Sequence, residues 1–198
     1  DDILLGSNRV PGKIQGKDRA GRVYVLFGRT SWPSAIDLAT TPASVTIYGR
    51  NRLDILGSFL TIGDYDLNGK KDILIAAPGE DGPAGTRIDS GSTVILVGRT
   101  SWPASIDLAI ANPSQRIYGF GANDFFSDNR GLALGDLDLD GRPEVVMGAR
   151  LADGRNNTAD AAGESRSYQP PLAPPATADL ATSTRHVIYG LEASDVTS

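Results

Sequence analysis

Short runs of apolar residues recur along the chain, and they are rich in the β-branched and aromatic side chains that favour β-strands. One run occupies residues 22–27, a second occupies 72–76 and a third occupies 93–97. Gly, Pro or Asp bounds each run, as is typical of tight turns between short strands. No segment of about ten residues or more has the periodicity of an amphipathic helix. The pattern therefore predicts an all-β protein.

The runs belong to an internal repeat of about 70 residues. Gly28–Pro33 recurs as Gly98–Pro103, and Ile36–Ala39 recurs as Ile106–Ala109 at the same offset. A weaker third copy of the second segment stands at 178–181. Because a repeat of this length is one supersecondary unit, we expect the chain to be an array of similar units stacked on one another.

Each complete repeat is expected to supply four antiparallel strands, two of which flank an acidic turn. In the middle copy we place them at residues 58–63, 72–76, 93–97 and 116–118. In the third copy the strands around the turn fall at 130–135 and 144–149, while 163–168 is a poor match to the third strand. A four-stranded sheet cannot bury both faces alone, so neighbouring repeats must cover it, as blades do in a β-propeller.

We therefore expect a partial β-propeller with two full blades, at residues 50–119 and 120–190. Residues 1–49 form an incomplete blade that lacks its first strand and its acidic turn, and residues 191–198 begin the next blade. The chain opens on Asp2–Gly6, which aligns with the strand that leaves the acidic turn, so we interpret the chain as a fragment.

Two acidic turns, Asp64–Asp72 and Asp136–Glu144, lie at equivalent points of the repeat. Each carries oxygen-bearing side chains at positions 1, 3, 5 and 9, and a glycine at position 6 that permits a sharp turn and brings the position-7 carbonyl inward. Calcium takes six to eight such oxygens, so we predict two Ca²⁺ sites. The expected ligands are Asp64, Asp66, Asn68, the Lys70 carbonyl and Asp72, and then Asp136, Asp138, Asp140, the Arg142 carbonyl and Glu144.

The alternative is that these segments are polar turns without a metal. The same pattern at two equivalent points argues against it, and two carboxylates about 4 Å apart repel by roughly 4 kcal/mol at an effective dielectric of about 20. The last ligand opens a strand at position 9, unlike the EF-hand, and Mg²⁺ is disfavoured because it retains several waters. The side chains of Lys70 and Arg142 are expected to point to solvent.

The composition of the chain argues against several classes of binding partner and of chemistry. The net charge of −5 argues against a nucleic-acid or anionic-membrane partner. The chain has no Cys, so neither a disulfide nor a thiol nucleophile is available. No apolar run approaches the roughly 20 residues that a membrane-spanning helix needs, so we expect no membrane insertion.

The repeat and its acidic turns resemble the FG-GAP family, which includes the integrin α-subunit head and many bacterial surface proteins. The family's Gly-Ala-Pro element reads Ala76–Pro78 and, less well, Gly148–Arg150, and its Phe-Gly element reads Leu56–Gly57 and degrades to Phe126–Ser127. The acidic turns match the family at every ligand position. The resemblance implies a calcium-binding propeller at the cell surface or outside the cell.

Three functions are compatible with this resemblance. The first is a non-enzymatic adhesion module in which Ca²⁺ braces the blades and loops bind a protein or glycan partner. The second is the non-catalytic propeller portion of a secreted hydrolase, such as a phospholipase or a polysaccharide-degrading enzyme, and the third is a purely structural array. No Ser/His/Asp set, metal-hydrolase His cluster or phosphate loop is visible, so we expect this chain not to be an enzyme.

For a few single residues the sequence allows a functional and a purely structural interpretation. Trp32 and Trp102 could stack on sugar rings, but their copied Ser-Trp-Pro setting favours packing at the blade rim. His186 is the only histidine and lies in an expected strand, so we expect no catalytic role for it. Asn156–Thr158 fits a glycosylation acceptor, within an expected solvated loop at residues 151–162.

Overall fold

The computed structural model describes residues 1–14, 16–128, 131–154, 161–184 and 186–190. This part of the chain is all-β, as the hydrophobic pattern predicts, with one short 3-10 helix and no helix long and apolar enough to cross a membrane. The elements are β1 (Ile3–Ser7), β2 (Arg22–Leu26), β3 (Val45–Tyr48), β4 (Leu60–Gly63), β5 (Asp72–Ala77), η1 (Pro83–Gly85), β6 (Ser92–Leu96), β7 (Ser105–Asp107), β8 (Gln115–Tyr118), β9 (Leu132–Gly135), β10 (Glu144–Ala149), β11 (Glu164–Tyr168), β12 (Thr177–Asp179) and β13 (His186–Tyr189).

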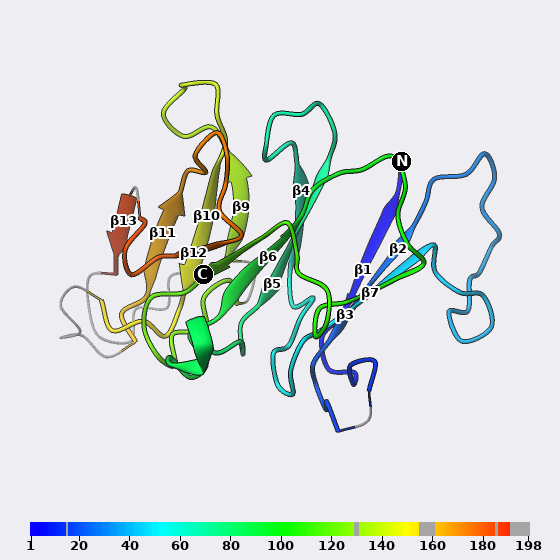
Figure 1. Ribbon diagram of the computed structural model, residues 1–198, viewed down its shortest axis with the longest axis horizontal. Helices are drawn as coiled ribbons and strands as arrows, with labels where there is room; N and C mark the ends of the chain where they lie inside the picture. Colours follow the sequence, from blue (N-terminus) through cyan, green and yellow to red (C-terminus); the bar gives the residue numbers. More distant parts are fainter. Residues whose placement is uncertain (15, 129–130, 155–160, 185, 191–198) are drawn as a thin grey trace.

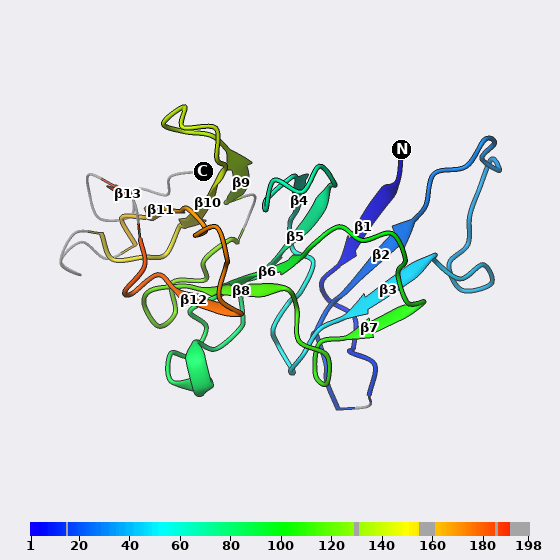
Figure 2. The same cartoon turned by 45° about the horizontal axis from the view of Figure 1, so that its top comes forward.

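The strands form three sheets that lie side by side along the molecule (Figure 1). The first sheet has the order β1-β2-β3-β7, the second has β4-β5-β6-β8-β12 and the third has β9-β10-β11-β13. Among the described residues, the three sheets do not close into a ring (Figures 1 and 2). The fold is therefore a series of four- and five-stranded sheets, one for each copy of the repeat.

Four antiparallel strands are found in the second and third copies, close to the predicted positions. The third strand of the third copy, a poor match in sequence, is the regular strand β11, which pairs with β10 and β13. Arg166 stands where β6 has Val94 and Glu164 stands where β6 has Ser92, and these two charged side chains are buried and ion-paired to each other. Mutual charge compensation thus allows a polar segment to occupy an interior strand.

Two sheets carry a further, parallel strand at the outer edge, which the sequence did not predict. β7 leaves the second copy and pairs in parallel with β3 of the first sheet, with Ile106 opposite Ile47. β12 leaves the third copy and pairs in parallel with β8 of the second sheet, with Ala178 opposite Ile117. The repeated segment, Ile-Asp-Leu-Ala in the second copy and Ala-Asp-Leu-Ala in the third, therefore begins with an edge strand that pairs with the sheet of the preceding copy. A segment this short has no hydrophobic period that could reveal its partner.

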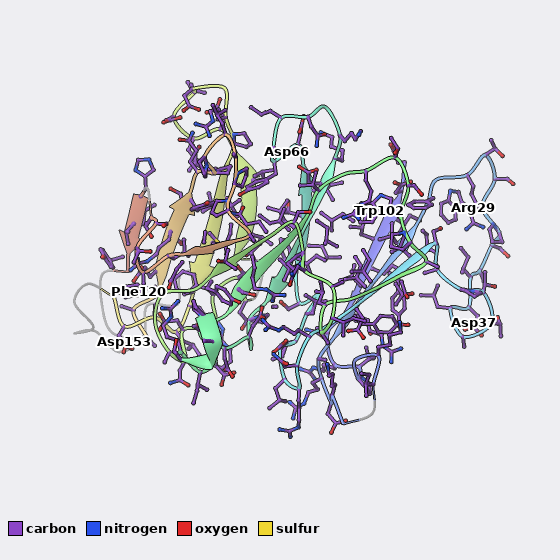
Figure 3. All side chains as sticks on the ribbon, viewed as in Figure 1. Arg29, Asp37, Asp66, Trp102, Phe120 and Asp153 are labelled. Atoms are coloured by element: carbon purple, nitrogen blue, oxygen red, sulfur yellow. The ribbon has the colours of Figure 1, made fainter. Side chains whose placement is uncertain are left out.

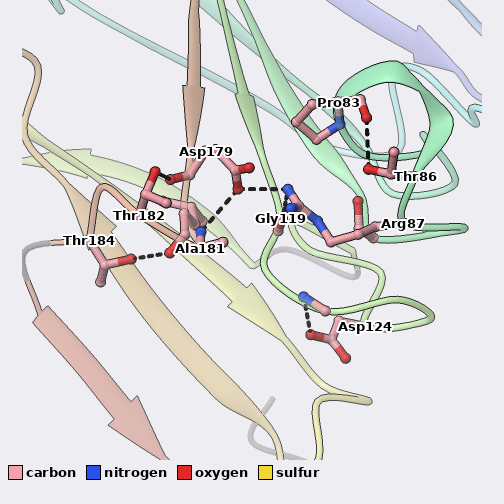
Figure 4. A network of polar contacts seen from close by, with 12 residues as sticks. Pro83, Thr86, Arg87, Gly119, Asp124, Asp179, Ala181, Thr182 and Thr184 are labelled. Carbon is pink, nitrogen blue, oxygen red and sulfur yellow. Dashed lines mark hydrogen bonds and ion pairs between the residues drawn. The ribbon is translucent and has the colours of Figure 1, made fainter.

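The β12 crossing is fixed by a charged contact as well as by backbone pairing. Arg87 extends from the β5–β6 connection and donates through Nη2 to the Gly119 carbonyl at 3.0 Å and to Asp179 Oδ1 at 2.6 Å (Figure 4). The same Asp179 carboxylate accepts the Ala181 N–H at 3.0 Å, which starts a turn directly after β12. The contact ties the end of β12 to the second sheet.

Two apolar clusters hold the sheets together, one at each junction between neighbours. The cluster between the first and second sheets contains Val23, Val25, Val45, Ile47, Leu56, Ile73, Ile75, Val94 and Leu96, with Ile106 and Leu108 from the crossing segment. The cluster between the second and third sheets contains Tyr65, Leu74, Ile95, Ile117, Phe126, Leu132, Val145, Met147 and Tyr168, with Ala178 and Leu180 from the crossing segment. Strands β5 and β6 of the second sheet thus direct alternate side chains toward the first sheet and toward the third sheet.

Candidate metal sites

The two acidic turns occupy the same position in neighbouring sheets. The first joins β4 to β5, the second joins β9 to β10, and both lie at the upper end of the molecule in Figure 1. Position 9 of each turn is the first residue of the following strand, Asp72 or Glu144, and both are fully buried. Each turn is therefore anchored at its last residue in a buried strand, while its central residues are exposed.

Three carboxylates converge in the first turn. Oxygen atoms of Asp64, Asp66 and Asp72 all lie within 4.8 Å of one another. Asp66 is exposed and lies in the turn below its tip, as Figure 3 shows. The structure thus brings together three of the predicted ligands, while the ligand role of Asn68 and of the Lys70 carbonyl stays a prediction.

Short-range hydrogen bonds shape the first turn. Asp64 Oδ2 accepts the Gly69 N–H at 2.9 Å, Asp66 Oδ1 accepts the Asn68 N–H at 3.2 Å, and Asn68 Oδ1 accepts the Lys70 N–H at 2.9 Å. The backbone curls inward because Leu67 (φ 60°) and Gly69 (φ 81°) are left-handed. Asp64 Oδ1 is buried and has no hydrogen-bond partner. An acceptor in this state is well suited to a cation.

The carboxylate of Asp72 fixes the turn to the rest of the sheet. Its Oδ2 accepts the Tyr65 N–H at 2.7 Å, and its Oδ1 accepts the Gly98 N–H at 2.6 Å, just beyond β6. A Cβ at Gly98 would meet the Lys71 carbonyl at 2.5 Å, so only glycine fits. Sequence reasoning noticed Gly98 as a repeated residue but missed this role. The Gly28 N–H meets Asp2 Oδ1 at 2.7 Å in the same way, which explains why both glycines recur.

Burial governs the charge of Asp72. It raises the pKa of this carboxyl group, the N–H donors of Gly98 and Tyr65 lower it, and the negative charge of Asp66 raises it again. A bound cation would reverse the effect of burial by stabilising the ionised form. The first turn therefore places three carboxylates close together, in an arrangement that a hard cation would stabilise by offsetting their repulsion and the burial of Asp72.

The second turn repeats this arrangement. Oxygen atoms of Asp136, Asp138 and Glu144 all lie within 4.8 Å of one another. Asp136 Oδ2 accepts the Gly141 N–H at 2.8 Å, and Glu144 Oε2 accepts the Leu137 N–H at 2.8 Å. Leu139 (φ 61°) and Gly141 (φ 84°) take the left-handed conformations seen in the first turn. The two turns therefore share one backbone design, as their sequences predict.

Asp140 is held differently from the other expected ligands of the second turn. Its Oδ1 accepts the Arg142 N–H at 2.9 Å, and its Oδ2 accepts a hydrogen bond from Gln169 Nε2 at 2.9 Å. The three-carboxylate group does not include it. Its role as a ligand stays a prediction.

The expectation that the Arg142 side chain points to solvent is wrong. Arg142 is half-buried and donates through Nη2 to the carbonyl of Pro170, in the proline-rich segment after β11. Pro170 stands where the second copy has Gly98, and proline has no N–H to give to the acid at position 9. The arginine supplies a different link between turn and loop. Lys70 is exposed, as expected.

Two further groups of buried charges lie on the connections between sheets, and sequence reasoning missed both. In the second sheet Glu80 pairs with Arg116 and accepts from Ser92, and buried Asp54 lies beside them. In the third sheet buried Asp124 lies beside the Glu164–Arg166 pair, and Arg166 is also stacked 3.8 Å from the centre of the Phe120 ring. The two ion pairs come from different positions of the repeat, so comparing the copies could not have found them.

Asp54 and Asp124 stabilise equivalent turns in two different copies of the repeat, each by accepting a backbone hydrogen bond. Asp54 Oδ2 accepts the Asn51 N–H at 2.7 Å, and Asp124 Oδ2 accepts the Gly121 N–H at 2.9 Å. Burial, together with the nearby charge of Glu80, raises the pKa of Asp54 to about 8. Burial and the nearby Glu164 raise the pKa of Asp124 to about 6. These groups have structural roles between the sheets.

The remaining candidate residues have packing or surface roles. Trp102 packs against the cluster between the first and second sheets, with Arg99 stacked 4.6 Å from its ring centre. Trp32 is exposed in a protruding segment, and the guanidinium group of Arg29 is stacked 4.6 Å from the centre of its ring. His186 is exposed on β13. The glycosylation candidate Asn156–Thr158 and half of the expected loop at 151–162 lie outside the described residues.

Comparison with known proteins gives one informative similarity. The chain is 30% identical to integrin alpha-PS2 of Drosophila melanogaster over an alignment of 159 residues, and the match covers 77% of this chain. It spans only 10% of the length of the fly protein. No protein-family profile matches the chain. The similarity indicates an integrin-α-like relationship, and it agrees with the all-β repeat seen in the structure.

Proposed function

We propose that the chain is a calcium-binding repeat module of an integrin-α-like extracellular protein, with one Ca²⁺ ion in each acidic turn. The observation that carries this proposal is the convergence of three carboxylates within 4.8 Å at the same point of two neighbouring sheets. Three like charges at this distance favour binding of a divalent ion, which offsets their repulsion. The similarity to an integrin alpha subunit supports an adhesive, non-enzymatic role for the protein.

The ions have a structural role in this proposal. Each one stabilises a hairpin end, between β4 and β5 or between β9 and β10, next to a neighbouring sheet. Gly63 at the end of β4 lies directly against Leu134 of β9. The approach is so close that a Cβ on Gly63 would be only 2.4 Å from Leu134 Cδ2. Ions at these hairpins therefore brace the edge where the second and third sheets meet. A protein or glycan partner would bind to loops that this bracing holds in place.

Calorimetry with calcium-free protein tests the proposal. We expect heat of Ca²⁺ binding with a stoichiometry of two, falling to one in Asp66→Asn and in Asp138→Asn and to zero in the double variant. Asp37→Asn is a matched control, because Asp37 is an exposed aspartate that caps a turn outside both sites. Absence of calcium heat from correctly folded protein, together with crystals grown in excess calcium that show only water in both turns, would refute the proposal.

A further inference from the structure

The second acidic turn is joined by two side-chain contacts to the part of the chain that follows β11. Gln169 donates through Nε2 to Asp140 Oδ2 at 2.9 Å, and Arg142 donates through Nη2 to the Pro170 carbonyl. Asp140 Oδ1 accepts the Arg142 N–H at 2.9 Å within the turn itself. Both oxygens of this carboxylate are therefore held, one from inside the turn and one from outside it.

The first turn is attached to its following chain in a different way. The strand registers align Val97 of the second copy with Gln169, and a valine side chain has no hydrogen-bond donor. The link comes instead from the Gly98 N–H, which Asp72 Oδ1 accepts at 2.6 Å. The following chain is thus bonded to position 9 of the first turn and, through side chains, to positions 5 and 7 of the second.

Gln169 is the first residue of a proline-rich segment, residues 169–175, in which four of the seven residues are proline. Proline fixes the φ angle, so the segment is stiff. Its far end leads into β12, which pairs with β8 of the second sheet, and Asp179 at the end of β12 accepts from Arg87 at 2.6 Å. In Figure 1 the segment (orange) rises beside the second turn and then descends to β12. It therefore connects the second turn to the edge of the second sheet.

The same segment forms one wall of a groove between the second and third sheets, with a volume of about 760 Å³. Tyr118 and Tyr168 line the groove from the two sheets, and Gln169, Pro171 and Pro175 line it from the segment. Hydroxyl-bearing side chains of β12 and of the turn after it complete the lining. The position of the segment thus determines the shape of this groove.

Asp140 is the point at which the segment meets an expected calcium ligand. A group that hydrogen-bonds to a metal-ligating carboxylate fixes the orientation of that carboxylate, and its loss typically costs about 10–100-fold in metal affinity. Gln169 is neutral, so it orients Asp140 without placing a positive charge beside the ion. A contact of this kind connects the affinity of the second turn for calcium to the position of the segment.

We propose that Gln169 is a positioning residue of the second calcium site, and that calcium bound there holds the proline-rich segment, and with it the wall of the groove, in place. This inference rests on the proposed function, because it requires an ion in the second turn. The coupling is reciprocal, since a contact that strengthens calcium binding is itself strengthened by calcium to the same extent. The first site lacks this coupling, because Val97 stands in place of Gln169.

Calorimetry on the full chain with one site removed measures the calcium affinity of each turn separately. Asp66→Asn leaves the second site, and Asp138→Asn leaves the first. Gln169→Ala is expected to raise the dissociation constant of the second site about tenfold and to leave that of the first site unchanged. Val97→Ala is the matched control, because it shortens the aligned side chain beside the first turn, and we expect it to change neither dissociation constant.

Hydrogen exchange followed by mass spectrometry tests the coupling in the other direction. Calcium should slow exchange in peptides that cover residues 169–179, both in the native chain and in Asp66→Asn, which retains the second site. The slowing should be absent in Asp138→Asn, which retains only the first site. At saturating calcium it should be smaller in Gln169→Ala than in the native chain. A role of Gln169 in the fold alone would not make the exchange of this segment depend on calcium.

The outcomes separate this inference from the function on which it rests. If calcium binds to neither turn of the native chain, both are wrong. If two calcium ions bind but Gln169→Ala keeps the native affinity at the second site, the inference is overturned and the proposed function stands. Exchange of the segment that is the same with and without calcium, or that responds equally to the first site, overturns it as well.

Discussion

The hydroxyl group of Tyr65 donates a hydrogen bond to Oε1 of Gln115, which joins the first acidic turn to the fourth strand of its sheet. Gln115 in turn donates through Nε2 to the Tyr168 hydroxyl of the third sheet at 3.1 Å. All three residues are almost completely buried. The second residue of the metal turn is therefore part of the junction between two sheets, and burial, as the largest cause, raises the pKa of Tyr65, so it remains a neutral donor.

Removing this hydroxyl is expected to destabilise the sheet junction. Tyr65→Phe leaves the buried Gln115 oxygen without its donor, which should lower the free energy of unfolding by about 1–3 kcal/mol. Urea denaturation monitored by tryptophan fluorescence measures the loss. Tyr24→Phe on β2 is the control, since this half-buried tyrosine belongs to the free face of the first sheet. Equal stability of the Tyr65→Phe variant and the native chain would show that the bond contributes nothing.

Calcium removal is expected to lower the melting temperature. Binding to the folded state stabilises it by about 2.7 kcal/mol per site when free calcium is about 100 times the dissociation constant. Asp66→Asn and Asp138→Asn should each lose part of this gain in calcium while differing little from the native chain in chelator. Differential scanning calorimetry in both buffers checks this. Native melting curves that superimpose in calcium and chelator contradict the prediction.

The raised pKa of Asp54 predicts a pH dependence of stability with a definite sign. The folded state holds the proton up to a pH of about 8, whereas the unfolded chain releases it near 3.8, so this contribution to stability is complete at acidic pH and is lost as pH rises from about 4 to 8. The slope for one proton is at most about 1.4 kcal/mol per pH unit. Glu80, Arg116 and Arg50 are the charges that act on Asp54.

The Asp54→Asn variant should not show this loss, because the amide does not titrate and its oxygen can still accept the Asn51 N–H. Urea denaturation at several pH values, in chelator so that metal binding does not contribute, compares the variant with the native chain. Asp124→Asn is an internal comparison with a narrower window, from about 4 to 6, because the pKa of Asp124 is raised to about 6. A difference between Asp54→Asn and the native chain that does not change with pH argues against a raised pKa.

Breaking the buried ion pair of the second sheet is expected to be costly. The side chains of Arg116 and Glu80 are only 5% and 2% exposed. Arg116→Met leaves the buried Glu80 carboxylate with only the more exposed Arg50, whose Nη1 lies 3.7 Å from Glu80 Oε1, and should reduce the free energy of unfolding by up to about 3–5 kcal/mol. The double variant Glu80→Gln with Arg116→Met should recover much of this loss, because no buried charge is left. A double variant less stable than Arg116→Met would contradict this explanation.

The sequence by itself determined the class of fold, the period of the repeat, the four antiparallel strands of each complete copy and the acidic turns. These features depend on patterns and interactions of residues close together in the chain, such as the short β-branched apolar run of β5 and the carboxylate-to-backbone bonds of the turn at Asp64. Residue type and spacing are sufficient to encode them. For this reason Asp64, Asp66 and Asp72 could be proposed as one group before their positions were known.

Only the tertiary structure decided which sheet each edge strand joins and how the buried charges are compensated. The segment Ser105–Asp107 looks the same in sequence whether it stays with its own sheet or crosses to the preceding one. Arg142 binds Pro170 and Glu164 pairs with Arg166 because the folded chain brings these groups together in low-dielectric surroundings. Contacts of this kind depend on the positions of distant segments, so neither periodicity nor composition could predict them.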